Sequence, residues 1–183
     1  MSYKRWLFIA VVLFGIGLVL GLATTAGITD LLAEDVADLE ELAELLSPLP
    51  QAAFFVFVLV KNVSAVLISF ALSPIFCLAP VMALIFNGGI LGLVSVLVVQ
   101  EKSVGYLLAG LLPHGIFELP AFIIGEAAAL SFGTAVVLAL FKKERRKLLL
   151  PNFRQNLRYL AVALILFLPA AIIETYVTPL FLN

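Results

Sequence analysis

The chain has 183 residues, of which 63% are hydrophobic and 13% are charged, and its mean hydropathy is +1.19. Soluble domains are about 45–50% apolar and about 25% charged, so both values argue against a soluble enzyme and favour a membrane-spanning protein. The net charge is −1, and the one basic cluster lies between apolar stretches. There it is better explained as a topology signal than as a nucleic-acid-binding surface.

The first predicted element is the apolar stretch at 6–26, which follows Lys4 and Arg5. A secretory signal peptide has the same basic start, but its apolar core is only about 7–15 residues long. A helix that crosses the bilayer needs about 20 apolar residues. We therefore predict an uncleaved first transmembrane helix.

The next stretch, at 29–47, is acidic, and it carries seven of the twelve acidic residues of the chain. Its leucines and other apolar residues recur at helical spacing, and Pro48 and Pro50 follow it. This pattern predicts an acidic amphipathic helix. Such a helix either lies on the lipid surface or rests its leucines on the bundle. The second arrangement is favoured, because surface helices are usually rich in Lys and Arg.

Two apolar stretches, at 52–73 and 81–99, are predicted to be the second and third spans, and the third is interrupted by Asn87-Gly88-Gly89. The following stretch, at 103–141, has no basic residue and is too long for one crossing at about 1.5 Å per residue. Because this stretch contains two prolines, we expect a short half-helix, a break or re-entrant turn near 112–114, and a long helix. Such breaks occur at membrane depth where protein or water satisfies the freed backbone.

The last predicted span covers about 157–175. Of the eleven basic residues, seven fall between 142 and 158, and two more are Lys4 and Arg5. All nine can face the cytoplasm if 27–50 lies outside, as the positive-inside rule requires. This predicts an all-α, polytopic transmembrane bundle in the cytoplasmic (cell) membrane, with about five net crossings. The N-terminus is then cytoplasmic and the C-terminus external, and residues 1–183 form a single integral membrane domain.

Polar side chains inside predicted spans are costly and are candidates for function. His114 and Glu118 lie one helical turn apart, on the same face as a stripe of small residues, so this face is expected to point into the bundle. The predicted intramembrane polar cluster comprises Asn62, Asn87, His114, Glu118, Glu126 and Glu174. The predicted helix-packing positions are Gly88, Gly92, Ala121, Gly125, Ala129 and Gly133.

Three interpretations of the polar cluster follow from these residue types. The first is a hydrogen-bonded network that fixes helix packing, and the second is a proton or ion pathway. The third is a divalent metal site for Zn or Fe, with ligands drawn from His114, Glu118, Glu126 and Glu174. No cofactor is firmly implied. Lys61 either pairs with a glutamate or contacts a substrate.

A resemblance to a known family becomes visible at His114. The stretch PHGIFELPA at 113–121, followed by IGEA at 124–127, resembles the stage II sporulation protein M family. Two further stretches look like the same family. They are Asn62-Val63 together with FNGGILG at 86–92, and IETYVTP at 173–179.

The resemblance implies an all-helical, multi-pass protein of the cytoplasmic membrane. In spore-forming bacteria the family's namesake belongs to an engulfment complex and helps to localise peptidoglycan-degrading partners. Similar proteins also occur in bacteria and archaea that form no spores. The resemblance brings no established catalytic residues.

The sequence thus favours a membrane scaffold or partner-binding component. The alternatives are a small transporter or channel that uses the polar cluster, and an intramembrane metal-dependent enzyme. An enzyme is disfavoured, because no nucleophile elbow, P-loop or Ser/His/Asp arrangement is present. The expected partners are the lipid bilayer, other membrane or envelope proteins and further copies of the chain, as in a homodimer.

Overall fold

The computed structural model describes residues 3–23, 41, 45 and 48–182, and this part of the chain is helical and contains no strand. Five helical segments are long and apolar enough to cross a membrane, the last of them running from Lys143 to Leu182. In chain order the elements are α1 (Tyr3–Leu22), α4 (Gln51–Leu72), α5 (Leu78–Glu101), α6 (Val104–Phe141), the 3₁₀ helix η1 (Lys143–Leu148), α7 (Leu149–Ile172), the π-helix η2 (Ile173–Val177) and α8 (Pro179–Leu182). The prediction of an all-α polytopic membrane bundle is confirmed.

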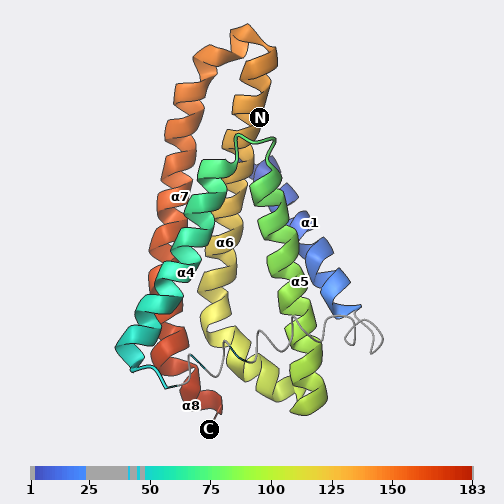
Figure 1. Ribbon diagram of the computed structural model, residues 1–183, viewed down its shortest axis with the longest axis vertical. Helices are drawn as coiled ribbons and strands as arrows, with labels where there is room; N and C mark the ends of the chain where they lie inside the picture. Colours follow the sequence, from blue (N-terminus) through green and yellow to red (C-terminus); the bar gives the residue numbers. More distant parts are fainter. Residues whose placement is uncertain (1–2, 24–40, 42–44, 46–47, 183) are drawn as a thin grey trace.

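The five long segments alternate in direction, so that the start of α1 and the α6–α7 hairpin lie toward one end of the bundle and the C-terminus lies at the other (Figure 1). α1 packs mainly against α5, α6 packs mainly against α7, and α4 also contacts α6. This arrangement agrees with five crossings. Which end faces the cytoplasm stays a prediction.

Glycines let α1 and α5 approach until their backbones touch. A Cβ atom added to Gly88 of α5 would collide with the carbonyl oxygen of Phe14 and come within 2.9 Å of the backbone nitrogen of Leu18. One added to Gly92 would come within 2.7 Å of the backbone nitrogen of Leu22. Close contact of this kind is how membrane helices gain packing energy, because the hydrophobic effect does not draw them together in lipid.

The predicted break at 112–114 is wrong, because α6 is one continuous helix of 38 residues that includes Pro113 and Pro120. Each proline removes one backbone donor, and membrane helices tolerate this loss as a bend. Figure 1 shows α6 bending in its N-terminal part. Its opposite end extends with α7 beyond the other helices. This projection explains why α6 is longer than the roughly 20 residues that one crossing requires.

Two other predicted features differ in the structure, namely the interruption of the third span and the start of the last span. α5 runs without interruption through Asn87-Gly88-Gly89, and α7 begins at Leu149, earlier than the predicted start near 157. α7 is amphipathic in this region, where Arg154 and Arg158 are exposed, and so it continues outside the apolar stretch. The predicted acidic helix at 29–47 lies outside the described residues except for two isolated positions.

Candidate functional site

A cavity of about 270 Å³ lies between the helices and is lined by most of the predicted polar cluster. Asn62 lies midway along α4, Asn87 lies midway along α5, and Phe14 is near the middle of α1. The cavity is therefore at mid-depth in these spans. Its polar and charged lining residues are Lys61, Asn62, Asn87, His114, Glu118 and Glu174.

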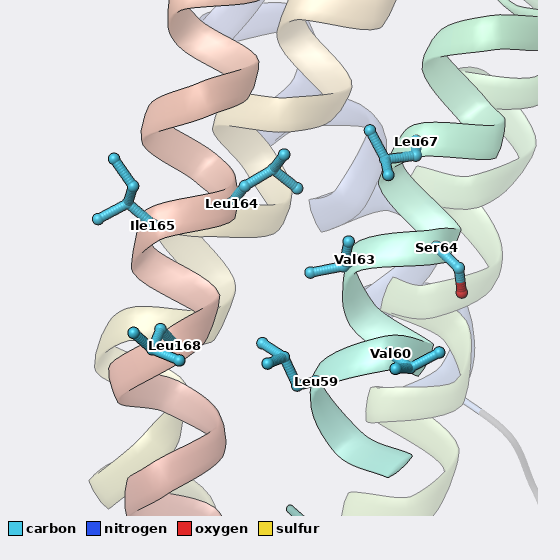
Figure 2. Close-up of a pocket in the computed structure, with 8 residues that line it drawn as sticks. All are labelled: Leu59, Val60, Val63, Ser64, Leu67, Leu164, Ile165 and Leu168. Atoms are coloured by element: carbon cyan, nitrogen blue, oxygen red, sulfur yellow. The ribbon is translucent and has the colours of Figure 1, made fainter. Parts of the chain in front are cut away.

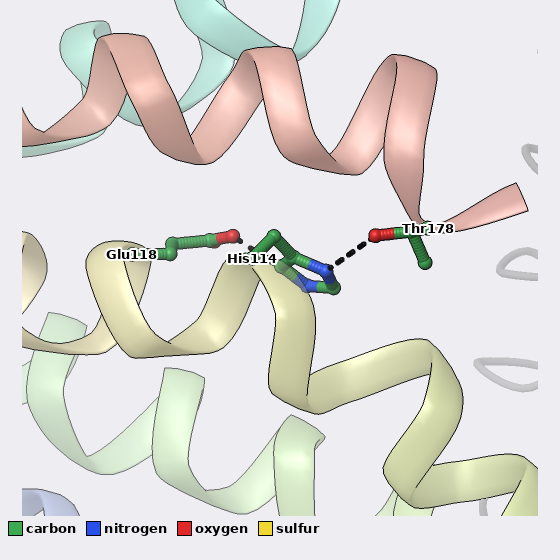
Figure 3. A network of polar contacts seen from close by, with 3 residues as sticks. All are labelled: His114, Glu118 and Thr178. Carbon is green, nitrogen blue, oxygen red and sulfur yellow. Dashed lines mark hydrogen bonds and ion pairs between the residues drawn. The ribbon is translucent and has the colours of Figure 1, made fainter. Parts of the chain in front are cut away.

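His114, Glu118 and Glu174 form the most closely grouped part of this lining. One donor atom from each of the three side chains can be chosen so that all lie within 4.8 Å of one another. Nε2 of His114 is 3.8 Å from Oε2 of Glu118, one turn along the same helix. The other ring nitrogen, Nδ1, is 3.4 Å from the hydroxyl oxygen of Thr178, so Glu118 and Thr178 flank the imidazole (Figure 3).

Glu174 and Thr178 reach this point through an irregularity of the last helix. Residues Ile173–Val177 form a π-helix, and the backbone N–H of Thr178 donates to the carbonyl oxygen of Ile173 at 2.8 Å. π-helical turns are rare and are found disproportionately at functional sites, because the extra residue re-aims the side chains that follow. Here the π-turn presents side chains of the last helix to α6.

The two asparagines of the cavity wall differ in their exposure. Asn62 is 8% exposed, whereas Asn87 is exposed and its side-chain amide donates to the carbonyl oxygen of Ala83 on its own helix at 2.8 Å. Lys61 also lines the cavity, together with the carboxyl-bearing residues Glu118 and Glu174. Of the other predicted cluster members, the structure places Glu174 beside His114 and Glu118.

Glu126 is separated from the rest of the predicted cluster. It is fully buried two turns beyond Glu118 on α6, and one of its carboxyl oxygens accepts a hydrogen bond from the hydroxyl of Ser69. The other oxygen has no hydrogen-bond partner among the described residues. Glu126 lines neither the cavity nor the group of possible metal ligands, so Glu174, and not Glu126, is the further predicted carboxyl group that lies beside His114 and Glu118.

The predicted helix-packing positions pack inside the chain. Ala121 and Ala129 are fully buried, and Gly125 faces Val66 and Ala163 from two other helices. A Cβ atom added to Gly133 would collide with the carbonyl oxygen of Ser73 and come within 2.8 Å of the carbonyl carbon of Ser73. The small-residue stripe on α6 is thus used within one copy of the chain.

A larger groove of about 520 Å³ between α4 and α7 is a poor candidate for chemistry. Figure 2 shows aliphatic side chains of α4 and α7 facing each other across it. Its lining residues are Leu59, Val60, Val63, Ser64, Leu67, Leu164, Ile165 and Leu168. None of these side chains is titratable. An apolar groove between membrane-spanning helices suits lipid acyl chains.

Sequence reasoning missed three features of this architecture. Thr178 lies in the stretch at 173–179 that resembles the family, but its contact with His114 depends on the π-turn. Gly17 and Gly21 of α1 pack on the backbone of α5, and their four-residue spacing was the signal that could have identified them. The place of Lys61 in the cavity wall could not be predicted without knowing which helices are neighbours.

The fold and the site define the class of this molecule: it is a polytopic integral membrane protein with a polar cavity within its spans. The family model for stage II sporulation protein M matches residues 10–179, and the chain belongs to this family. An uncharacterized protein from Methanocaldococcus jannaschii is 27% identical over 173 residues, covering 93% of this chain and 92% of the relative. No solved structure was found to match the chain.

Proposed function

We propose that the protein is a small membrane transporter that binds a cation in the cavity beside His114, Glu118 and Glu174. The observation that carries this proposal is the cavity itself, which holds two carboxyl groups and an imidazole at mid-depth in the spans. Polar groups that served only to lock helices together would be expected to bond to one another and leave little space. Since a water molecule occupies about 30 Å³ in the liquid, this cavity has room for several.

The helical irregularities around the cavity support the same proposal. Transporters place substrate and ion sites near the bilayer midplane, beside helices that depart from regular geometry. Here the proline-containing helix α6 and the π-turn of the last segment meet at the site. The backbone groups freed by such irregularities can then face a polar cavity.

The charges of the lining favour a cation. Two carboxyl side chains outnumber the single lysine in the lining, and the imidazole adds a ring nitrogen that can coordinate a cation. Phe122 and Phe167, both buried, also line the cavity. These bulky side chains would obstruct a permanently open pore. They therefore favour a carrier, which must change conformation to release its ion.

The test is ion flux into liposomes that contain the purified protein. Entry of H⁺, Na⁺, K⁺, Mn²⁺ and Zn²⁺ is followed with entrapped fluorescent reporters under an imposed gradient. The wild type should accelerate the entry of at least one ion, and Glu118→Gln should return that rate to the rate of protein-free liposomes. The matched control is Glu101→Gln, which changes an exposed carboxyl group at the end of α5 and should leave the rate unchanged.

Two results would refute the transporter proposal. One is an absence of accelerated flux for all five ions by protein that is folded in the liposomes. The other is flux that Glu118→Gln and Glu101→Gln leave equally intact. In either case the cavity would not lie on an ion pathway.

A scaffold or partner-binding role is the second candidate, and the projecting α6–α7 hairpin favours it. The hairpin extends beyond the other helices (Figure 1), and the 3₁₀ helix at its tip has the sequence KERRKL. Phe141, Leu148 and Leu150 are all more than half exposed there. A tip that combines exposed apolar side chains with basic ones suits contact with another membrane protein.

Site-specific photo-cross-linking in native membranes would test the scaffold role. A photoreactive amino acid at Leu148 should give a discrete cross-linked protein, and the same probe at Ile165 in the lipid-facing groove should not. Reversing the charges of Arg145 and Arg146 should abolish the product. A product that persists after charge reversal, or none at Leu148, would remove the hairpin as a partner-binding surface.

A further inference from the structure

We infer that His114, Glu118 and Glu174 are the ligands of a divalent transition-metal ion, of the Zn²⁺ or Fe²⁺ class, bound in the mid-depth cavity. The inference deepens the proposed transport function by naming its ion, and it rests on that function. The three side chains come from two segments far apart in the chain, α6 and the π-helix η2. Glu174 therefore lies beside His114 and Glu118 because of the tertiary fold, and not because of proximity in the sequence.

The distances fit a site that is close to complete. Zinc binds His nitrogen and carboxylate oxygen at about 2.0–2.2 Å, so neighbouring donor atoms in a tetrahedral site are roughly 3–3.5 Å apart. Nε2 of His114 and Oε2 of Glu118 are already 3.8 Å apart, and all three donor atoms lie within 4.8 Å of one another. Small rotations of the two flexible glutamate side chains would close the remaining gap.

The second nitrogen of His114 is placed as it is in metal centres. A histidine that binds a metal through one ring nitrogen almost always donates its other N–H to a neighbouring oxygen, which fixes the ring. The hydroxyl of Thr178 is 3.4 Å from Nδ1 of His114, on the far side of the ring from Glu118 (Figure 3). Thr178 is therefore a positioning residue for the metal ligand.

The chemistry of the donor set selects the kind of ion. One imidazole nitrogen and two carboxylate oxygens suit Zn²⁺, Fe²⁺ and neighbouring first-row ions, whereas Mg²⁺ and Ca²⁺ prefer an all-oxygen shell. Three protein ligands leave one coordination position open to the cavity, unlike a closed structural zinc site. A doubly charged ion would also neutralise two carboxylates that are costly to hold within a membrane.

Metal binding is tested on the purified protein in detergent, with Co²⁺ as the probe because its visible absorption reports coordination. The wild type should bind one Co²⁺ per chain, and added Zn²⁺ should displace it. His114→Ala, Glu118→Gln and Glu174→Gln should each weaken Co²⁺ binding by about tenfold or more. Glu126→Gln is the matched control, since it changes an intramembrane carboxyl group outside the cavity, and it should bind as the wild type does.

The positioning role of Thr178 adds a second measurement. Thr178→Val removes the hydroxyl at nearly constant volume and should weaken Co²⁺ binding by about tenfold, whereas Thr178→Ser should retain it. Thermal unfolding of every metal-free variant establishes that the fold survives. Weaker binding by a variant that unfolds as the wild type does is then a loss of the site itself.

The outcomes separate this inference from the transport proposal. An absence of the Co²⁺ band, or equal weakening by Glu126→Gln and Glu118→Gln, overturns the metal site even if the liposomes conduct H⁺ or Na⁺. Co²⁺ binding that depends on the three ligands, without flux of any ion, supports the metal site and refutes transport. Mn²⁺ entry that is lost in His114→Ala supports both.

Discussion

Replacing Gly88 by alanine should separate α1 from α5, while the same change at the adjacent Gly89 should not. A Cβ atom at position 88 would collide with the backbone carbonyl of Phe14 and lie 2.9 Å from the backbone nitrogen of Leu18. Because both obstacles are backbone atoms, no side chain can rotate out of the way. At position 89 the nearest atom is the carbonyl oxygen of Gly17 at 3.7 Å, which is an ordinary contact.

The magnitudes of two opposing effects can be compared. Replacing glycine by alanine within a helix favours the helix by about 1 kcal/mol at either position. Overpacking a close contact costs about 1–3 kcal/mol, and the upper part of this range applies where a whole helix must shift. Gly88→Ala should therefore lower the free energy of unfolding by about 1–2 kcal/mol, and Gly89→Ala should leave it unchanged or raise it by up to about 1 kcal/mol.

The assay uses the single tryptophan of the chain, Trp6, which is buried near the start of α1. Its fluorescence should report the release of α1 as a denaturing detergent is titrated into protein held in a mild one. The midpoint for Gly88→Ala should fall below that of Gly89→Ala. Equal midpoints, or a lower midpoint for Gly89→Ala, would refute the proposed backbone contact between α1 and α5.

Three further predictions concern other parts of the molecule. Gly125→Leu should lower the thermal midpoint in detergent, because the new side chain meets Val66, and an unchanged midpoint would contradict the packing. Ser69→Ala should destabilise the protein by about 1–3 kcal/mol in chemical unfolding, since it leaves the Glu126 carboxyl group without its donor. The double variant with Glu126→Met should recover most of that loss, and no recovery would show that the pair is not coupled. A cysteine at position 145, in a Cys77→Ser background, should resist impermeant thiol reagents on intact cells, and labelling from outside would reverse the predicted topology.

The sequence alone was sufficient to identify the transmembrane segments. Each crossing requires a long apolar stretch, and polar side chains are so costly in lipid that those present stand out. For the same reason the spacing of His114 and Glu118 was enough to place them on one inward-facing side of a helix. The prediction of a break at Pro113 was wrong, because the loss of one backbone donor is tolerated within a long membrane helix.

Only the tertiary structure decided which inward-facing groups meet. Helical periodicity gives the direction of a side chain but not the neighbouring helix or its depth, so it could not separate Glu126 from the cavity or place Glu174 beside His114. The contact between His114 and Thr178 depends further on a π-turn, in which a single extra residue rotates the end of the last helix. Such a local change in helical twist leaves no periodic signal in the sequence, because hydrogen bonding and packing around it select the conformation.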